Sequence, residues 1–96
     1  MHHPLYDVVN FSIVEPYTLR IVFDDGIERT INFESVLYGE MFGPLRDLQM
    51  FNQVRLDAEV RTLVWPNGAD FDPWTLHEWH RFAEALAKRA RAWETT

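Results

Sequence analysis

The chain has 96 residues, of which 47% are hydrophobic and 15% aromatic, with a formal net charge of −6 and no cysteine. A chain of this length makes one domain and buries roughly 60–70% of the surface that it exposes when unfolded. The lack of cysteine excludes disulfides, iron–sulfur clusters, a thiol nucleophile and cysteine-bound zinc. No apolar run approaches the ~20 residues of a membrane span, and residues 1–4 lack the pattern of a signal peptide. We therefore expect a single folded domain, residues 1–96, in the cytoplasm.

The negative charge is concentrated in the first three quarters of the chain. Residues 1–76 contain twelve Asp or Glu and five Arg, a net charge of −7, whereas residues 77–96 contain three Glu and four Lys or Arg, a net charge of +1. Because an acidic surface repels phosphate backbones, we do not expect nucleic-acid binding unless the C-terminal segment supplies it.

Alternating apolar residues predict three antiparallel strands in the first half of the chain. The first runs from Leu5 to Val14 and ends before Pro16. The other two strands have apolar faces, with Arg29 the one interruption, formed by Tyr17, Leu19, Ile21 and Phe23 and by Ile27, Ile31 and Phe33. The turn between these two strands contains Asp24-Asp25-Gly26.

The length of that turn follows from the apolar faces. A two-residue loop would place the two faces on opposite sides of the sheet, because strand side chains alternate. Pairing Phe23 with Ile27 aligns the faces. We therefore predict a three-residue loop, a type I turn with Gly26 in the left-handed conformation.

The middle of the chain predicts short helical turns and a second hairpin. Residues 34–38 are consistent with one helical turn, residues 39–43 with a loop, and Pro44 opens a short helix that reaches Leu48. Residues 54–56 and 63–65 predict two strands around a loop at residues 58–60. The inward-facing residues of this hairpin are predicted to be Val54, Leu56, Leu63 and Trp65.

Near the C-terminus a helical period replaces the alternation. One stripe with spacings of three and four contains Trp79, Phe82, Ala83, Leu86, Ala90 and Trp93. We predict one helix from about Pro73 to about Trp93. The predicted fold is α+β: a small antiparallel sheet made of a three-stranded meander plus a second hairpin, with a short middle helix and a C-terminal helix packed on it. The core of this domain spans residues 5–76.

The segment WPNGADFDP, from Trp65 to Pro73, predicts a strand end and a tight turn. Pro66 favours an extended Trp65, and Asn67 and Gly68 tolerate the backbone conformations of a turn.

The rest of the segment predicts the start of a helix. The Asp72 carboxylate can accept hydrogen bonds from the free backbone N–H groups of the first turn, and Pro73 suits the first helical position. Phe71 then points inward, and Asp70 and Asp72 point outward. The oxygen atoms of Asn67, Asp70 and Asp72 suit a hard cation, but the spacing lacks the order of a calcium loop. The structural interpretation is favoured.

A polar cluster on the predicted helix is a second candidate site. His77, His80 and Glu84 lie on one surface, so two imidazoles and a carboxylate could bind a divalent metal or share a proton. The HExxH pattern is absent, and a polar helix flank in which Glu84 pairs with Arg81 or Lys88 is favoured. The chain also lacks a nucleophile elbow, a P-loop and a dinucleotide motif. We predict no catalytic residue, no metal and no cofactor.

Three segments of the chain resemble a bacterial family called domain of unknown function 2442. They are residues 17–26 (YTLRIVFDDG), residues 44–47 (PLRD) with Phe51, and residues 63–73 (LVWPNGADFDP). The resemblance covers about Leu5 to Leu76. It implies a compact antiparallel α+β domain and no established enzymatic activity. It also implies antitoxin-like pairing with a small protein encoded beside it, because small members of the family often have such a neighbour.

Three classes of function stay open. The first is a non-catalytic protein-interaction module, which the acidic body favours. The second is a DNA-binding or regulatory accessory that uses the basic residues Arg81, Lys88, Arg89 and Arg91. The third is a small metal-dependent enzyme at His77, His80 and Glu84.

The C-terminal helix is the predicted interaction surface. Its stripe of Trp79, Phe82, Leu86, Ala90 and Trp93 is about 20 Å long at ~1.5 Å per residue, and a domain of this size covers a limited part of it. We expect either a homodimer or a protein partner to cover the rest. The alternative is that the helix packs wholly on its own sheet.

Overall fold

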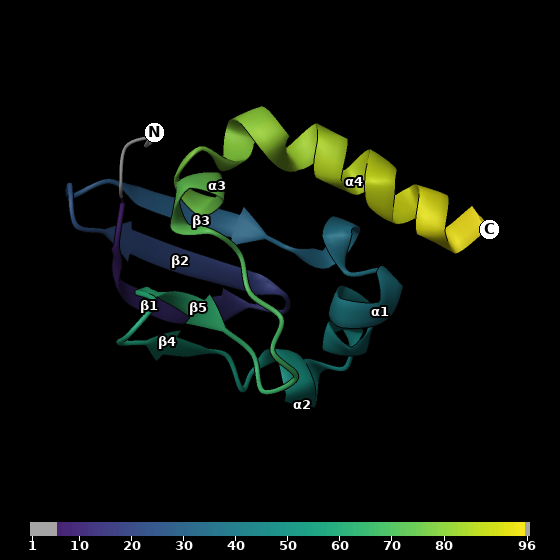
Figure 1. Ribbon diagram of the computed structural model, residues 1–96, viewed down its shortest axis with the longest axis horizontal. Helices are drawn as coiled ribbons and strands as arrows, with labels where there is room; N and C mark the ends of the chain where they lie inside the picture. Colours follow the sequence, from purple (N-terminus) through teal and green to yellow (C-terminus); the bar gives the residue numbers. More distant parts are fainter. Residues whose placement is uncertain (1–5, 96) are drawn as a thin grey trace.

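The computed structural model describes residues 6–95, without the side chains of residues 90, 91 and 93–95. A three-stranded sheet and a two-stranded hairpin are joined by short helices, and a long helix crosses one side of the molecule (Figure 1). The elements in order are β1 (Val8–Glu15), β2 (Thr18–Phe23), β3 (Glu28–Asn32), η1 (Glu34–Val36), α1 (Gly39–Phe42), η2 (Gly43–Arg46), α2 (Leu48–Phe51), β4 (Arg55–Asp57), β5 (Thr62–Val64), α3 (Pro73–His77) and α4 (Trp79–Thr95). The predicted α+β fold is confirmed.

The first three strands form an antiparallel meander in the order β1-β2-β3. Leu19 of β2 pairs with Ile31 of β3, and the register continues to the hairpin tip, where the Phe23 N–H donates to the Ile27 carbonyl at 2.9 Å. Gly26 closes the turn with φ of 87°, and its N–H donates to the Phe23 carbonyl. The predicted three-residue loop and the left-handed Gly26 are therefore confirmed. Ile27, predicted on the apolar face, is 38% exposed because it lies at this tip.

The second hairpin, β4–β5, has Leu56 opposite Leu63. Its loop spans residues 58–61, one residue longer than predicted, because Arg61 adopts a positive φ of 59° and its N–H returns to the Asp57 carbonyl. The Asp57 carboxylate accepts from the N–H groups of Glu59 and Val60. The hairpin is joined to β1 by a hydrogen bond from the Val8 N–H to the Arg61 carbonyl.

Short helical segments fill the middle of the chain. A 3-10 turn at Glu34–Val36 and a second at Gly43–Arg46 with Pro44 near its start agree with the predictions. Two α-helical turns, α1 and α2, lie before and after the second of these segments. The loop predicted over residues 39–43 is wrong, because Gly39 adopts a φ of 91° and begins α1.

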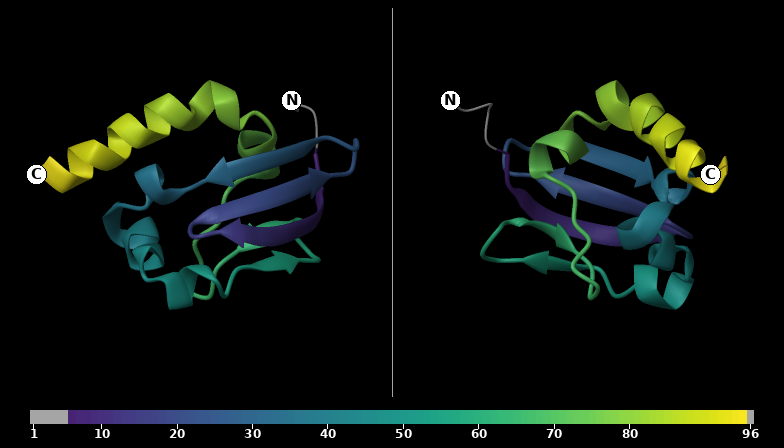
Figure 2. Two further views of the ribbon diagram at one scale, coloured as in Figure 1. Left: turned by 180° about the vertical axis from the view of Figure 1, so that it is seen from behind. Right: turned by 45° about the vertical axis from the view of Figure 1, so that its right-hand side comes forward.

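The predicted continuous helix from Pro73 to Trp93 is divided. α3 ends at His77, and Glu78 adopts a non-helical backbone (φ −102°, ψ 29°) before α4 begins at Trp79. α4 runs beside β3, contacts η1 and α1, and its last turns extend beyond them (Figures 1 and 2). Asp72 is the residue before the first turn of α3, but its carboxylate makes no capping hydrogen bond and stays exposed, so that part of the prediction is wrong.

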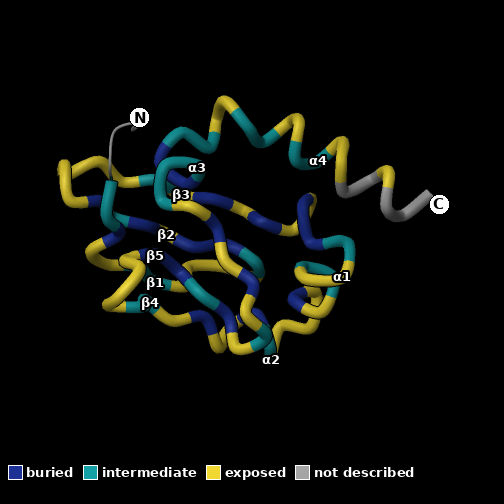
Figure 3. The backbone as a smooth tube through the Cα atoms, viewed as in Figure 1, coloured by how far each residue is buried: buried dark blue, intermediate teal, exposed yellow. Residues whose placement is uncertain are grey.

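The core lies between the inner face of the meander, the second hairpin and the helices (Figure 3). Trp65 is at its centre, with 1% of the residue exposed, and contacts the rings of Phe33, Phe51 and Phe71. The predicted inward orientation of Trp65 and Phe71 is confirmed. Within residues 6–95, none of the helices combines the length and the apolar character that crossing a membrane requires.

Candidate functional site

The predicted interaction stripe is attached to the body over the first part of α4. The Trp79 ring packs on Phe33 and Phe71 at centroid distances of 5.2 and 5.6 Å, and Leu86 packs against the core. Phe82 makes an edge contact with Trp74 at 5.1 Å. The side chains of Ala90 and Trp93, the remaining members of the stripe, lie outside the described residues.

The opposite face of α4 is polar. Its exposed charged and titratable residues are His80, Arg81, Glu84, Lys88 and Arg89. The ion-pair partner of Arg81 is Glu78, at 3.7 Å, in place of the predicted Glu84. The described part of α4 therefore has an apolar side toward the body and a mostly basic side toward solvent.

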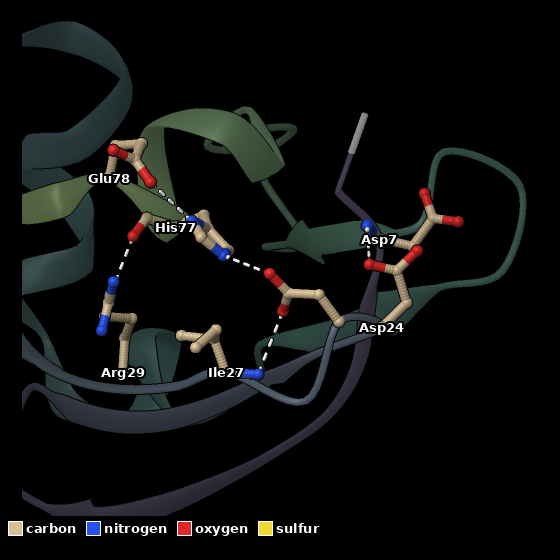
Figure 4. Close-up of polar contacts among 7 residues, drawn as sticks. Asp7, Asp24, Ile27, Arg29, His77 and Glu78 are labelled. Carbon is tan, nitrogen blue, oxygen red and sulfur yellow. Dashed lines mark hydrogen bonds and ion pairs between the residues drawn. The ribbon is translucent and has the colours of Figure 1, made fainter. Parts of the chain in front are cut away.

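The candidate at His77 has a different arrangement from the one predicted (Figure 4). Because the helix breaks after His77, its side chain turns into the body and is 7% exposed. Its Nε2 lies 2.8 Å from Asp25 Oδ2 and its Nδ1 lies 2.7 Å from Glu78 Oε2. The ring stacks on Tyr6 at 3.7 Å.

The backbone around this cluster is also held in place. Arg29 of β3 donates from Nε to the His77 carbonyl at 2.8 Å, which satisfies a carbonyl at the end of α3. The second Asp25 oxygen, Oδ1, accepts from the Ile27 N–H at 3.0 Å. The hairpin tip, β3 and the α3–α4 junction therefore meet at His77.

These contacts change the pKa values of both carboxyl groups. The backbone N–H of Ile27 and, to a smaller extent, His77 lower the pKa of Asp25 despite partial desolvation. The hydrogen bond from His77 lowers the pKa of Glu78, and the positive charge of Arg81 acts in the same direction. Both carboxylates therefore favour the ionised form.

The cluster offers neither a free base nor a metal ligand in this conformation. Both ring nitrogens of His77 are occupied, whereas a general base or a metal ligand needs one of them free. His80 lies on the exposed side of α4, and across the described residues no group of three His, Asp or Glu is arranged to hold a metal ion. A metal site at His77, His80 and Glu84 would require His77 to leave both carboxylates.

The sequence missed the partners of His77. Asp25 lies 52 residues away, and a hairpin carboxylate has no local pattern that points to it. Arg29 did give a signal, because a lone charged residue on an apolar strand face needs a polar partner nearby. The partner is the His77 carbonyl.

The turn at residues 65–69 has the structural role that the sequence favoured, whereas the helix cap predicted at Asp72 is not formed. Gly68 adopts a φ of 89°, and its N–H donates to the Trp65 carbonyl. Asn67 Oδ1 accepts from the Ala69 N–H, and Asn67 Nδ2 donates to the Met41 carbonyl at 2.8 Å. The Asn67 side chain is thus engaged within the fold, while Asp70 and Asp72 are exposed, as predicted.

Comparison with known proteins and families places the chain in a family. No curated protein and no solved structure shows significant similarity to the chain. Residues 8–82 match the family described as "Protein of unknown function (DUF2442)", a range that includes all five strands, the middle helices, the Trp65 turn and the His77 cluster. The resemblance found in the sequence is therefore confirmed, and the chain belongs to this family of unknown function.

Proposed function

We propose that this protein is a non-catalytic interaction module and that α4 is the element that binds its partner. The observation that carries the proposal is the extension of α4 beyond η1 and α1, after Trp79 and Leu86 have packed on the body (Figure 2). In the sequence, the apolar stripe continues to Ala90 and Trp93. When the apolar stripe of an amphipathic helix is longer than the surface of the body on which it packs, a second protein surface can cover the rest of the stripe.

A second copy of the chain is the partner that we propose. The exposed charges described on α4 are Arg81, Lys88 and Arg89 against Glu84, whereas residues 1–76 carry a net charge of −7. The basic side of one helix therefore complements the acidic body of another copy. Two such contacts related by a two-fold axis close a dimer.

The alternative partner is the small neighbouring protein that an antitoxin-like pairing implies. The same helix would bind it, because Trp is enriched at the centres of protein interfaces and Trp93 is the last apolar residue of the stripe. We further propose that the protein acts in the cytoplasm and needs no cofactor. A non-catalytic role is supported by the engagement of both His77 ring nitrogens with carboxylates.

Sedimentation velocity of the purified protein at micromolar concentrations tests the proposal. We expect a dimer for the wild type and a folded monomer for Trp93→Glu. The matched control is Val60→Glu, which adds the same charge at an exposed position of the β4–β5 loop, outside α4, and should leave the dimer intact. If the wild type is a monomer and Trp93→Glu lowers its thermal midpoint, the stripe packs on its own body and the proposal is overturned.

The partner is then identified by mixing. If the wild type is a monomer that forms a defined complex with the purified neighbouring protein, and Trp93→Glu abolishes that complex, the interaction function stands and the second copy is replaced by this protein. If Trp93→Glu leaves every association unchanged, α4 is not the binding element.

DNA binding is the second candidate, and the basic side of α4 is the observation that favours it. Arg81, Lys88 and Arg89 are exposed on one helix, although Glu84 interrupts them. Contacts to several phosphates would make the affinity fall steeply with salt concentration. A titration of duplex DNA at two salt concentrations tests this candidate.

A further inference from the structure

The contacts of His77 favour a ring that carries a proton on both nitrogens. A neutral imidazole has one N–H donor and one acceptor nitrogen, whereas an ionised carboxylate only accepts. Nδ1 and Nε2 both lie within 2.8 Å of a carboxylate oxygen. With a neutral ring, one of the two contacts would bring two acceptors together. The arrangement is complete only when the ring donates from both nitrogens and both carboxylates are ionised.

The three side chains connect parts of the fold that are far apart in the sequence. Asp25 comes from the β2–β3 loop, His77 from the end of α3, and Glu78 is the residue at which the chain leaves α3 for α4. Asp25 is itself fixed by the Ile27 N–H, so it offers His77 a rigid acceptor. Glu78, which lies between α3 and α4, is therefore connected to the β2–β3 hairpin through the His77 ring.

We propose that Asp25, His77 and Glu78 form a proton-dependent latch that holds the start of α4 against the β2–β3 hairpin. When the ring loses its second proton to water, one of the two carboxylates loses its donor and the α3–α4 junction loosens. Because α4 is the binding element of the proposed function, the latch would regulate that binding, and in this respect it depends on that proposal. The latch itself is a property of the monomer.

The other charged groups described around the ring already have partners, so they do not supply the hydrogen bond that a carboxylate loses when His77 is neutral. Arg29, from β3, is occupied by the His77 carbonyl, and Arg81 of α4 lies on the far oxygen of Glu78, Oε1. Asp24, next to Asp25, accepts from the Asp7 N–H. Tyr6 contributes a stacked ring face. His80 is the other titratable group on the first turn of α4, so it must be removed as a control.

Nuclear magnetic resonance of the full chain between pH 5 and pH 9 tests the latch. Ring ¹⁵N shifts report the protons on Nδ1 and Nε2 directly. At the acidic end of this range we expect His77 to carry both. On deprotonation, the amide signals of residues 78–81 should move and their hydrogen exchange should accelerate by roughly tenfold, because one net hydrogen bond changes a local opening equilibrium by about that factor.

Two substitutions assign the effect. His80→Gln should leave the response intact, and Asp25→Asn should reduce it, because the asparagine keeps the shape of the side chain and removes the charge. Asp25 is 37% exposed, so this variant is expected to fold even if His77→Gln does not.

The latch is overturned if the folded protein holds His77 with one ring proton throughout the range, or if the start of α4 is unaffected when the ring titrates. Sedimentation separates this result from the proposed function. If the latch fails and Trp93→Glu still dissociates the dimer, only the regulation is refuted. If the latch works and the protein shows no association that depends on α4, only the interaction function is refuted.

Discussion

Replacement of Trp65 tests the account of the core most directly. The residue is 1% exposed, and its ring lies 5.6 to 6.1 Å from those of Phe33, Phe51 and Phe71. Its Nε1–H donates to the Phe51 carbonyl at 2.9 Å. Phe33 and Phe71 also contact Trp79 of α4, so a cavity at Trp65 would weaken the layer between the second hairpin and α4.

The expected loss can be divided into two parts. Trp65→Ala removes the whole indole ring from a close-packed site, which costs about 3–5 kcal/mol. A domain of this size has a total free energy of unfolding of roughly 5–15 kcal/mol, so the variant should be close to unfolded or strongly destabilised. The lost hydrogen bond contributes little of this, because the Phe51 carbonyl also accepts from the Val54 N–H at 3.2 Å and keeps a partner.

Trp65→Phe is the milder variant. Phenylalanine keeps an apolar ring in the site but loses part of the ring volume and the N–H donor, for which we expect a combined loss of about 1–2 kcal/mol. Urea unfolding followed by far-ultraviolet circular dichroism measures both variants without relying on tryptophan fluorescence. The control is Val60→Ala, because Val60 is 54% exposed and should change stability by less than about 0.5 kcal/mol. If Trp65→Ala unfolds at the midpoint of the control, the core has been placed wrongly.

Three further predictions concern the turns and the acidic side chains. Gly26→Val should cost about 1–2 kcal/mol in a thermal melt from backbone strain alone, because no atom lies within 4 Å of the added Cβ, and equal stability would contradict the turn. Asn67→Asp should lower the free energy of unfolding by roughly 1 kcal/mol near neutral pH, because a carboxylate oxygen then faces the Met41 carbonyl and both atoms are acceptors. The loss relative to wild type should shrink in acid, where the carboxyl group can donate, and a loss that is independent of pH would argue against this contact. Backbone N–H groups of Val60 and Glu59 lower the pKa of Asp57, and His77 lowers that of Glu78. The two ionised carboxylates therefore stabilise the fold above their ordinary pKa values of roughly 4, and this stability is lost as they become protonated. The urea midpoint should fall as the pH drops below that region, and a flat profile would count against both contacts.

Local rules predicted the features whose causes are local. The parity of the apolar faces required Phe23 to pair with Ile27, and a loop of three residues then required a residue such as Gly26 that tolerates positive φ. The period of 3.6 identified the helix that contains Trp79 and Leu86, and both pack toward the body. In each case the answer depended on residues within a few positions of one another.

The errors have causes that lie elsewhere in the fold. Nothing between Leu76 and Trp79 is a helix breaker, so periodicity predicted one helix where the structure has two. At the break, the His77 ring contacts Asp25 and the His77 carbonyl accepts from Arg29, and both partners are more than forty residues away. The division between α3 and α4 and the composition of the His77 cluster are thus one tertiary event, and neither is visible locally.

Two tight turns of the chain have the same local structure but position different helical segments. Residues 23–27 (FDDGI) and residues 65–69 (WPNGA) each begin with a buried ring, carry Asp or Asn at the third position and Gly at the fourth, and close with the same pair of backbone hydrogen bonds. In each turn one side-chain oxygen, of Asp25 or Asn67, accepts from the turn itself.

The second polar atom of each side chain, Asp25 Oδ2 or Asn67 Nδ2, forms a hydrogen bond with a helical segment. The second Asp25 oxygen meets the His77 ring, and the Asn67 amide donates to the Met41 carbonyl. A rigid turn therefore positions a helical segment in both cases, and exchanging Asp for Asn would mismatch both contacts. The contacts of Trp65 and Asn67 thus explain this part of the sequence by the placement of the core and α1. The interaction function proposed for α4 has a different basis, the extension of this helix beyond η1 and α1.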